Sequence, residues 1–324
     1  MARVLLVSTG DTIAHRQHSG RPAIATATEL LAAVAAHLPT VDVRGEDVMA
    51  EPSWDTSPAT MLALARRVRA ALVDDGFDGV VVAHGVDTLE ETAFLTDLMA
   101  GPAATRGGIV FTGATRCLDD PAADGPANLA SAITAAADPA TRGLGALVCF
   151  DRRLHAARWA SLADISGASA FSSAPHPPLG HVTRAGRVTI TAAPPARPAP
   201  VEGAPESDVA LIKTYPGVPP ALLTTAADAG ARGIVLEGTG AGNVPVELFT
   251  TIGELTEWDI PIVLASRART APAALDDTHA GTGLATKVGA IGARGLGPTQ
   301  ARVALMVALG AGGVTAVRDW FAQL

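Results

Sequence analysis

Lysine, tyrosine and cysteine are scarce in this chain. The only lysines are Lys213 and Lys287, and the only tyrosine is Tyr215. The two cysteines, Cys117 and Cys149, are too few for a disulfide framework, and no zinc-ligand spacing is present. We therefore expect neither a structural metal nor another cofactor.

Long apolar segments and an excess of basic charge are also missing. No uninterrupted apolar stretch is long enough to span a bilayer, and the N-terminus enters a strand at once, without the regions of a secretory signal. Acidic residues outnumber basic ones by 32 to 24, which argues against nucleic acid or an anionic membrane as the partner. The expectation is a cytoplasmic protein with a small-molecule substrate.

Strands and helices alternate along the first part of the chain. Alternation of this kind indicates a mostly parallel, doubly wound sheet of the α/β class. Near residues 180–190 the pattern changes to a hairpin. The predicted strands are 4–7, 41–43, 79–83, 108–112 and 145–150, and the predicted helices are 28–38, 58–73, 88–99 and 121–137.

A proline-rich stretch without periodicity, residues 191–207, reads as a linker between two domains. The first domain is expected at 1–190, and a second, smaller α/β domain at 208–324. Within the second domain the predicted strands are 209–212, 233–236 and 262–264, and the predicted helices include 219–229, 246–258 and 299–309.

The stretch RVLLVSTGDTIA, residues 3–14, begins as an apolar run suited to a buried strand and ends in small, hydroxylated residues. A parallel strand that stops in such a turn brings side chains to the carboxyl edge of the sheet, where open α/β sheets hold their ligands. Thr12 is therefore a candidate nucleophile, with Asp11 as its neighbour. An ordinary strand-to-loop turn is the structural alternative.

The stretch VVVAHGVDTLEETAFL, residues 80–95, has the same organisation. A buried strand runs into a loop with Asp87 at its tip, and a helix follows. If the two strands are adjacent, Thr12 and Asp87 reach one small ligand, and the free N–H groups at the helix start suit a carboxylate or an oxyanion. The alternatives are Asp87 as a helix N-cap and His84 as a packed core histidine.

Residues 9–14, TGDTIA, resemble the TGGTIA signature of the bacterial-type L-asparaginase family, and residues 84–93, HGVDTLEETA, resemble its HGTDTxEETA signature. The resemblance is collinear over almost the whole chain. It implies a larger N-terminal sheet domain, a smaller C-terminal α/β domain, and a homodimer or homotetramer with sites at the subunit interface. Further matching segments are 113–116, 123–129, 238–243 and 300–302.

The resemblance implies hydrolysis of the side-chain amide of asparagine, and sometimes glutamine, through a covalent intermediate. Thr12 is similar in position to the attacking threonine, Ser53 to the serine that binds the substrate α-carboxylate, and Asp87 to the aspartate that holds its ammonium group. Asn243 resembles an asparagine supplied by the partner subunit. The candidates are Thr12, Asp87 and Asp11 for catalysis, and Ser53, Trp54, Gly85, Val86 and Asn243 for substrate binding.

The proton-handling residues of the family are missing. Val86 stands where the family has a second threonine, and valine has no hydroxyl to attack or relay a proton. The lysine that pairs with that threonine is expected near Leu162, yet no lysine occurs before Lys213. The lid at residues 15–25 carries no tyrosine, and no counterpart of an interface glutamate is found between residues 269 and 284.

Two replacements add groups to the site. Asp11 takes the place of the second glycine of TGGT, and Trp54 replaces a small or amide residue. Three interpretations stay open. In the first, the protein hydrolyses amides with another base, such as His15 or His18. In the second, Asp11 and Asp87 hold a cationic metabolite or exchange protons with it. In the third, the protein binds a ligand or partner without chemistry.

Loss of threonine, lysine and tyrosine together predicts weak or no L-asparaginase activity, because general base catalysis contributes roughly a hundredfold to ten-thousandfold. An L-asparaginase with an unusual proton relay is the alternative. Val86 alone is also compatible with an engineered change that traps an intermediate, but a single engineered change does not explain the missing lysine and tyrosine.

Overall fold

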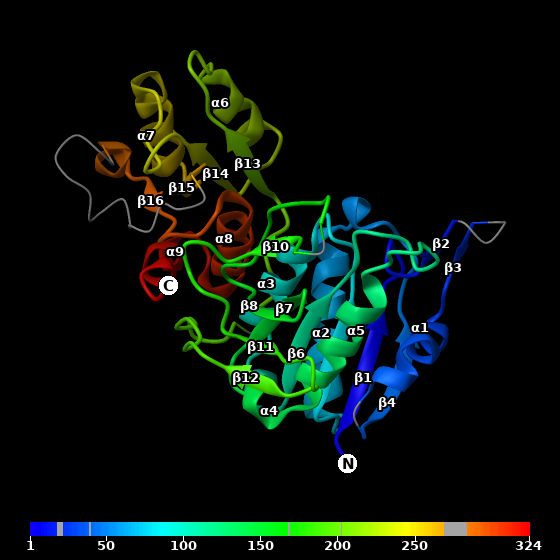
Figure 1. Cartoon of the computed structure of the whole chain (residues 1–324). Coiled ribbons are helices and arrows are strands. Elements are labelled where there is room, and N and C mark those ends of the chain that lie inside the picture. The colour runs from blue at the N-terminus through cyan, green and yellow to red at the C-terminus, as the bar shows by residue number, and fades with distance from the viewer. Residues whose placement is uncertain (18–21, 39, 168, 202, 269–283) are drawn as a thin grey trace. The chain divides into compact units, whose positions relative to one another are not determined.

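The computed structural model describes residues 1–324 except 18–21, 39, 168, 202 and 269–283. The chain divides into two compact units, Met1–Pro195 and Ala196–Leu324 (Figure 1). Among the described residues, no helix is both long enough and apolar enough to cross a membrane.

An eight-stranded sheet forms the centre of the first unit, in the order β12-β11-β8-β7-β6-β5-β1-β4. Strands β7, β6, β5, β1 and β4 pair in parallel, and β8, β11 and β12 are added by antiparallel pairings. The predicted mostly parallel sheet is therefore confirmed. The strands are β1 (Arg3–Ser8), β4 (Asp42–Asp47), β5 (Gly79–Ala83), β6 (Gly108–Thr112), β7 (Ala146–Phe150), β8 (Arg153–Ala156), β11 (Gly180–Val182) and β12 (Val188–Ile190).

Helices cover both faces of this sheet. Helices α1 (Ala27–Val34) and α5 (Gly125–Ala137) pack on one face, whereas α2 (Pro58–Val73) and α3 (Leu89–Met99) pack together on the other. Because both faces are covered, β5, β6 and β7 are buried along their whole length, as their continuous apolar sequences predict. The remaining elements are α4 (Ala103–Arg106), the 3-10 turns η1 (Ala35–His37), η2 (Ser53–Asp55) and η3 (Pro139–Thr141), and the two-stranded pairs β2 (His15–Arg16) with β3 (Ala23–Ile24) and β9 (Ser161–Leu162) with β10 (Phe171–Ser172).

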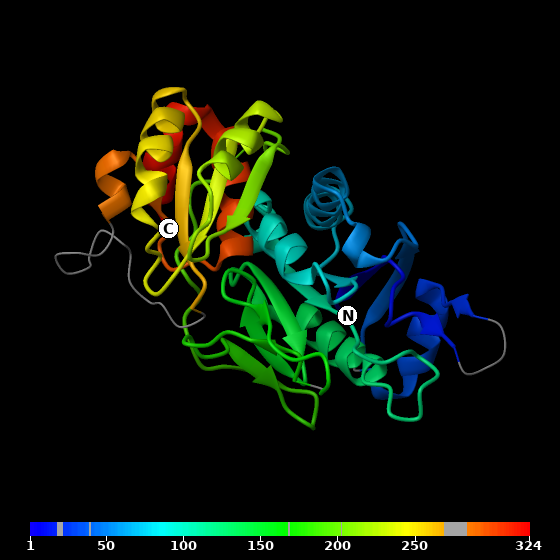
Figure 2. The same ribbon diagram turned by 90° about the horizontal axis from the view of Figure 1, so that it is seen from above.

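The second unit is a smaller α/β structure built on a four-stranded parallel sheet, in the order β13-β14-β15-β16. Helices α6 and α7 cover one side of it and α8 packs against the other (Figure 2). The elements are β13 (Val209–Lys213), α6 (Ala221–Asp228), β14 (Gly233–Gly238), η4 (Val246–Leu248), α7 (Phe249–Glu257), β15 (Ile262–Ser266), η6 (Leu284–Val288), β16 (Ile291–Gly292), α8 (Pro298–Gly312) and α9 (Val314–Phe321).

Local signals account for the elements whose bounds the sequence predicts best. Helix α2 begins at Pro58 because Ser57 caps it: the Ser57 hydroxyl accepts a hydrogen bond from the Thr60 N–H at 3.1 Å. The predicted start of α5 at residue 121 is wrong, because Asp120 accepts from the Ala122 N–H and closes a turn there. The helix proper begins at Gly125.

Candidate active site

The carboxyl ends of β1 and β5 are adjacent, as the sequence argument requires. The two strands pair in parallel, with Ser8 opposite Ala83, and the N–H and hydroxyl of Thr9 both donate to the Ala83 carbonyl. The chain then turns through Gly10 and Asp11, both in the left-handed region, with φ of 82° and 65°. This turn places Asp11 and Thr12 directly at the strand tip.

The Asp11 carboxylate is the centre of the site. Its Oδ1 accepts hydrogen bonds from the Thr12 N–H at 2.6 Å and from the Thr12 hydroxyl at 3.0 Å, and its Oδ2 accepts from the Ser53 N–H at 2.6 Å. Burial acts most strongly, and by itself raises the pKa of Asp11, but the hydrogen bonds from Ser53 and Thr12 outweigh it and lower this pKa. Asp11 is therefore an ionised carboxylate, only 3% exposed.

Ser53 joins the two strand tips. Its N–H donates to Asp11, and its hydroxyl donates to Asp87 Oδ2 at 3.4 Å. The Thr88 hydroxyl in turn donates to the Ser53 carbonyl at 2.8 Å. Thr12, Asp11, Ser53 and Asp87 thus form one connected group, which together with Gly85 and Val86 we call the strand-tip cluster.

Gly85 makes the close packing within the strand-tip cluster possible. A Cβ atom at this position would collide with Asp11 Oδ2 and with the Ser53 hydroxyl. A larger residue would displace the Asp11 carboxylate or Ser53. The glycine therefore has a structural role directly beneath the carboxylate.

Asp87 does not cap helix α3, which was the structural alternative to a binding role. The N-cap of the helix is Thr88, not Asp87, and no side chain caps it. Asp87 is exposed, whereas Thr12 is half-buried. Within the first unit, the buried Asp11 is therefore hydrogen-bonded to the half-buried Thr12 and linked through Ser53 to the exposed Asp87.

Val86 and Leu162 occupy the positions at which the resemblance led us to expect a threonine and a lysine. Val86 is 8% exposed, so its side chain is packed and brings no polar atom. The Leu162 N–H donates to Glu90 Oε2 at 2.6 Å, which joins β9 to the first turn of α3. This contact brings an apolar residue, not a cation, to that turn. Glu90 and Thr88 were not among the predicted site residues, although both lie in the second signature.

The histidines of this region differ in their surroundings. His84 is buried, at 1% exposed, and its Nδ1 lies 2.8 Å from the Gly85 carbonyl oxygen. Burial lowers the pKa of His84, so the ring is neutral at pH 7, which agrees with a packed core histidine. His15 lies in β2 and is half-buried, and His18 lies outside the described residues.

The remaining predicted contacts lie outside the strand-tip cluster. Trp54 follows Ser53 in η2 and is 69% exposed. Asn243 belongs to the second unit, where its backbone pairs with Thr239 in a tight loop after β14. The stretch 269–284, in which no counterpart of the interface glutamate is found, lies outside the described part of the chain except for Leu284. Within the described ranges, no group of three or more potential ligands is arranged to hold a metal ion.

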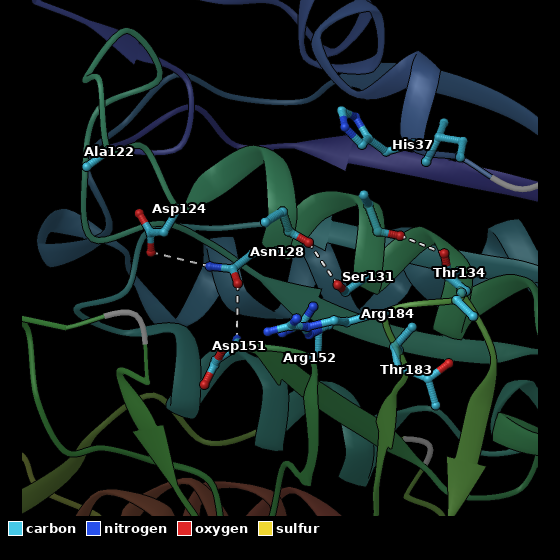
Figure 3. A pocket seen from close by; sticks show the side chains of 16 residues that line it. His37, Ala122, Asp124, Asn128, Ser131, Thr134, Asp151, Arg152, Thr183 and Arg184 are labelled. Atoms are coloured by element: carbon cyan, nitrogen blue, oxygen red, sulfur yellow. Dashed lines mark hydrogen bonds between the residues drawn. The ribbon is translucent and has the colours of Figure 1, made fainter.

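A second polar network in the first unit includes Asp124, Asn128 and Asp151, which line a hollow of about 750 Å³ (Figure 3). Asp124 accepts hydrogen bonds from the N–H groups of Thr115 and Arg116 and from the Asn128 amide, while Asn128 Oδ1 accepts from the Asp151 N–H at 3.1 Å. We call these five residues the Asp124 brace. The brace ties α5 to the loop after β6 and to the β7–β8 turn.

Comparison with known proteins agrees with this architecture. Residues 3–196 match the family model described as "Asparaginase, N-terminal", and residues 208–321 match "Glutaminase/Asparaginase C-terminal domain". A probable L-asparaginase of Deinococcus radiodurans is 34% identical over 317 residues, which cover 96% of this chain and 94% of that protein. L-asparaginase 2 of Escherichia coli is 29% identical over 324 residues, covering 95% and 89%.

A third relative is one of the subunits of glutamyl-tRNA(Gln) amidotransferase from Methanothermobacter thermautotrophicus. It is 33% identical over 279 residues, covering 82% of this chain but 62% of that protein, so the match spans less than two thirds of the longer relative. Both domain models match in sequence order, and the first contains the complete strand-tip cluster. The chain therefore belongs to the asparaginase family.

Proposed function

We propose that the protein hydrolyses the amide of a small metabolite, with Thr12 as nucleophile, and that it has weak or no L-asparaginase activity. The observation that carries the proposal is the 3.0 Å hydrogen bond from the Thr12 hydroxyl to Asp11 Oδ1. It joins a half-buried hydroxyl to an ionised carboxylate at the ligand-binding edge of the sheet. Membership of the asparaginase family, which includes L-asparaginases, supports amide hydrolysis as the reaction class.

In the proposed reaction, Thr12 Oγ1 attacks the amide carbonyl carbon and its proton passes to Asp11. The C–N bond then breaks, and the leaving nitrogen takes up that proton and departs as ammonia. A water molecule attacks the resulting ester, releases the carboxylic acid and restores the Thr12 hydroxyl. Asp11 is a weak base because its pKa is low, so it holds the proton of Thr12 only briefly. Its larger contribution is to orient the Thr12 hydroxyl and to stabilise the positive charge that develops on Thr12 Oγ1 as the proton moves.

Val86 and Leu162 support the proposal that this protein hydrolyses asparagine more slowly than an enzyme with a threonine and a lysine at these two positions. Neither side chain donates or accepts a proton, and no lysine precedes Lys213 in the sequence. We also propose, from the resemblance, that copies of the chain associate as a dimer or tetramer. In that assembly Asn243 of one copy contacts the substrate of another.

The test is covalent labelling of Thr12. Diazomethyl ketone analogues of small amides place an electrophilic carbon beside the carbonyl, and we expect the intact protein to gain the mass of the acylmethyl group on the peptide that contains Thr12. Thr12→Ala abolishes the adduct. Thr28→Ala, an exposed threonine of α1, is the matched control and leaves it unchanged.

Two results argue against the proposal. Rapid ammonia release from L-asparagine at neutral pH contradicts the low asparaginase activity. Neither ammonia release nor an adduct with any analogue, together with tight ligand binding that survives Thr12→Ala, supports a binding protein instead. The missing hydroxyl at Val86 and the missing cation at Leu162 are the observations that favour this second candidate function.

A further inference from the structure

The Asp11 carboxylate occupies two backbone hydrogen-bond donors of the strand-tip cluster, one at the β1 tip and one in η2. The N–H groups of Thr12 and Ser53 each reach it at 2.6 Å. Two converging backbone N–H groups form an anion-binding arrangement, and here the bound anion is a side chain of the protein itself. A substrate carboxylate cannot use these donors unless Asp11 leaves them.

Asp11 is held firmly in this place. Both of its oxygens accept hydrogen bonds, it is 3% exposed, and one oxygen lies against Gly85 where a Cβ atom has no room. Moving the carboxylate away breaks three hydrogen bonds and leaves buried N–H groups without partners, which is unfavourable. A ligand therefore meets Asp11 as a fixed part of the site.

The charge of the strand-tip cluster is negative. Asp11 and Asp87 are linked through Ser53, and in the described part of the chain neither carboxylate forms an ion pair with arginine or lysine. An anionic ligand group placed between them is repelled by both. A ligand ammonium is attracted by both, and Asp87 is exposed and free to receive it.

We propose that Asp11 determines specificity, so that the substrate is an amide that carries an ammonium group and lacks a carboxylate beside it. The inference rests on the proposed amide hydrolysis and names its substrate class. The Asp11 carboxylate takes the place of the carboxylate that a free amino acid would bring. It repels the amino acid's carboxylate and already occupies the two N–H donors that could bind it, whereas Asp87 binds the amine.

Four small amides distinguish the effect of a ligand's ammonium group from the effect of its carboxylate. L-asparagine carries both ammonium and carboxylate, 3-aminopropanamide only the ammonium, succinamic acid only the carboxylate, and propanamide neither. Binding is measured by calorimetry on the full-length Thr12→Ala variant, in which the proposed chemistry cannot occur. We expect 3-aminopropanamide to bind about tenfold or more tightly than L-asparagine, and succinamic acid to bind most weakly.

The diagnostic change is Asp11→Asn in the same Thr12→Ala background. Asparagine preserves the size of the side chain and is among the residues that best tolerate a positive φ. Its amide oxygen still accepts from one of the two backbone N–H groups, while the other N–H loses its acceptor. Without the charge, the preference for 3-aminopropanamide over L-asparagine is expected to fall about tenfold or more. Asp11→Gly, which empties the two N–H donors, shifts the preference further in the same direction.

Asp42→Asn is the matched charge control, because Asp42 lies opposite Arg3 at the amino end of the sheet, away from the strand tips. It leaves the preference unchanged. The inference is overturned if L-asparagine binds more tightly than 3-aminopropanamide, or if Asp11→Asn leaves the preference unchanged. These outcomes differ from failure of the proposed function, in which the protein with Thr12 intact hydrolyses none of the four amides and forms no adduct.

Discussion

The strand-tip cluster and the Asp124 brace are built from the same parts but have different surroundings. In each, one aspartate accepts backbone N–H groups from a turn that follows a parallel strand. Asp124 receives its remaining hydrogen bonds from the Thr115 hydroxyl and the Asn128 amide. Asn128 also bonds to Gly113 and Asp151 and thereby ties α5 to two loops. Asp11 instead accepts from the hydroxyl of half-buried Thr12 and lies near a second, exposed carboxylate.

The difference teaches that an aspartate with satisfied oxygens is not by itself a sign of catalysis. The Asp124 brace secures the framework, because its partners are mostly backbone groups of other elements. The strand-tip cluster has a hydroxyl that the carboxylate holds in position, and this hydroxyl belongs to a half-buried residue, Thr12. Substitutions in the Asp124 brace should therefore change stability, and those in the strand-tip cluster should change activity or specificity.

The largest expected effect is on turnover in Thr12→Ala. Removing the proposed nucleophile should lower kcat/KM for the best amide by about a thousandfold or more. The free energy of unfolding, measured by urea titration, should fall by less than about 1 kcal/mol, because one partly exposed hydrogen bond is lost. Thr12→Ser keeps the hydroxyl and should retain measurable activity. Full activity in Thr12→Ala would place the chemistry elsewhere.

Asp124→Ala should have the opposite effects, a large loss of stability and little change in activity. The N–H groups of Thr115 and Arg116 and the Asn128 amide lose their acceptor together, so we expect about 2–4 kcal/mol less stability in the same urea titration. The kcat/KM of the folded fraction should change less than about threefold, since no step of the proposed chemistry uses this group. A large loss of kcat/KM at unchanged stability would end the distinction between the two networks.

The pH dependence of stability distinguishes Asp11 from its neutral replacement. The folded-state pKa of Asp11 lies below its ordinary value of 3.8, so its ionised form stabilises the fold above pH 3.8, and this stabilisation is lost as the pH falls through the folded pKa. The stability difference between the natural protein and Asp11→Asn should therefore shrink as the pH decreases below 3.8. Urea titrations from pH 6 to about 3 test this. A difference that grows on acidification would mean that the pKa is raised.

The smallest effect is expected for Val86→Thr. The two side chains have nearly the same volume, and the added hydroxyl restores the residue type of the family signature without its lysine partner. L-asparagine hydrolysis, followed by ammonia release, should rise by less than about tenfold. Val86→Ala is the control for packing. A gain of several hundredfold would show that one hydroxyl suffices for the relay.

Much of the first unit follows from local sequence. The bounds of β5 and β6 are those predicted, because each is a short apolar run between turn residues. Strand β8 was not predicted, since the turn before it is formed by Asp151 and Arg152 at φ of 46° and 61°, without the glycine or asparagine that signals a tight hairpin. Helix α9 was also not among the predicted elements.

The candidate site could be predicted only in part. Adjacent parallel strands ending in Thr12 and Asp87 indicated that the two tips meet, and the structure joins them. Sequence patterns did not show that the Ser53 N–H binds Asp11, because Ser53 arrives from a loop after β4, 42 positions away along the chain. Contacts of that kind depend on tertiary packing, which periodicity does not describe.

Strand β4 is the edge strand next to β1, and its charged sequence affects how copies of the protein can associate. Its sequence DVRGED alternates charges of both signs along a strand with one unpaired side, and Arg67 binds Glu46 through two nitrogens at 2.8 and 2.7 Å. Charged border strands resist sheet-to-sheet extension and aggregation. If copies of this protein associate as proposed, they should therefore do so through helices and loops, leaving that border exposed to water.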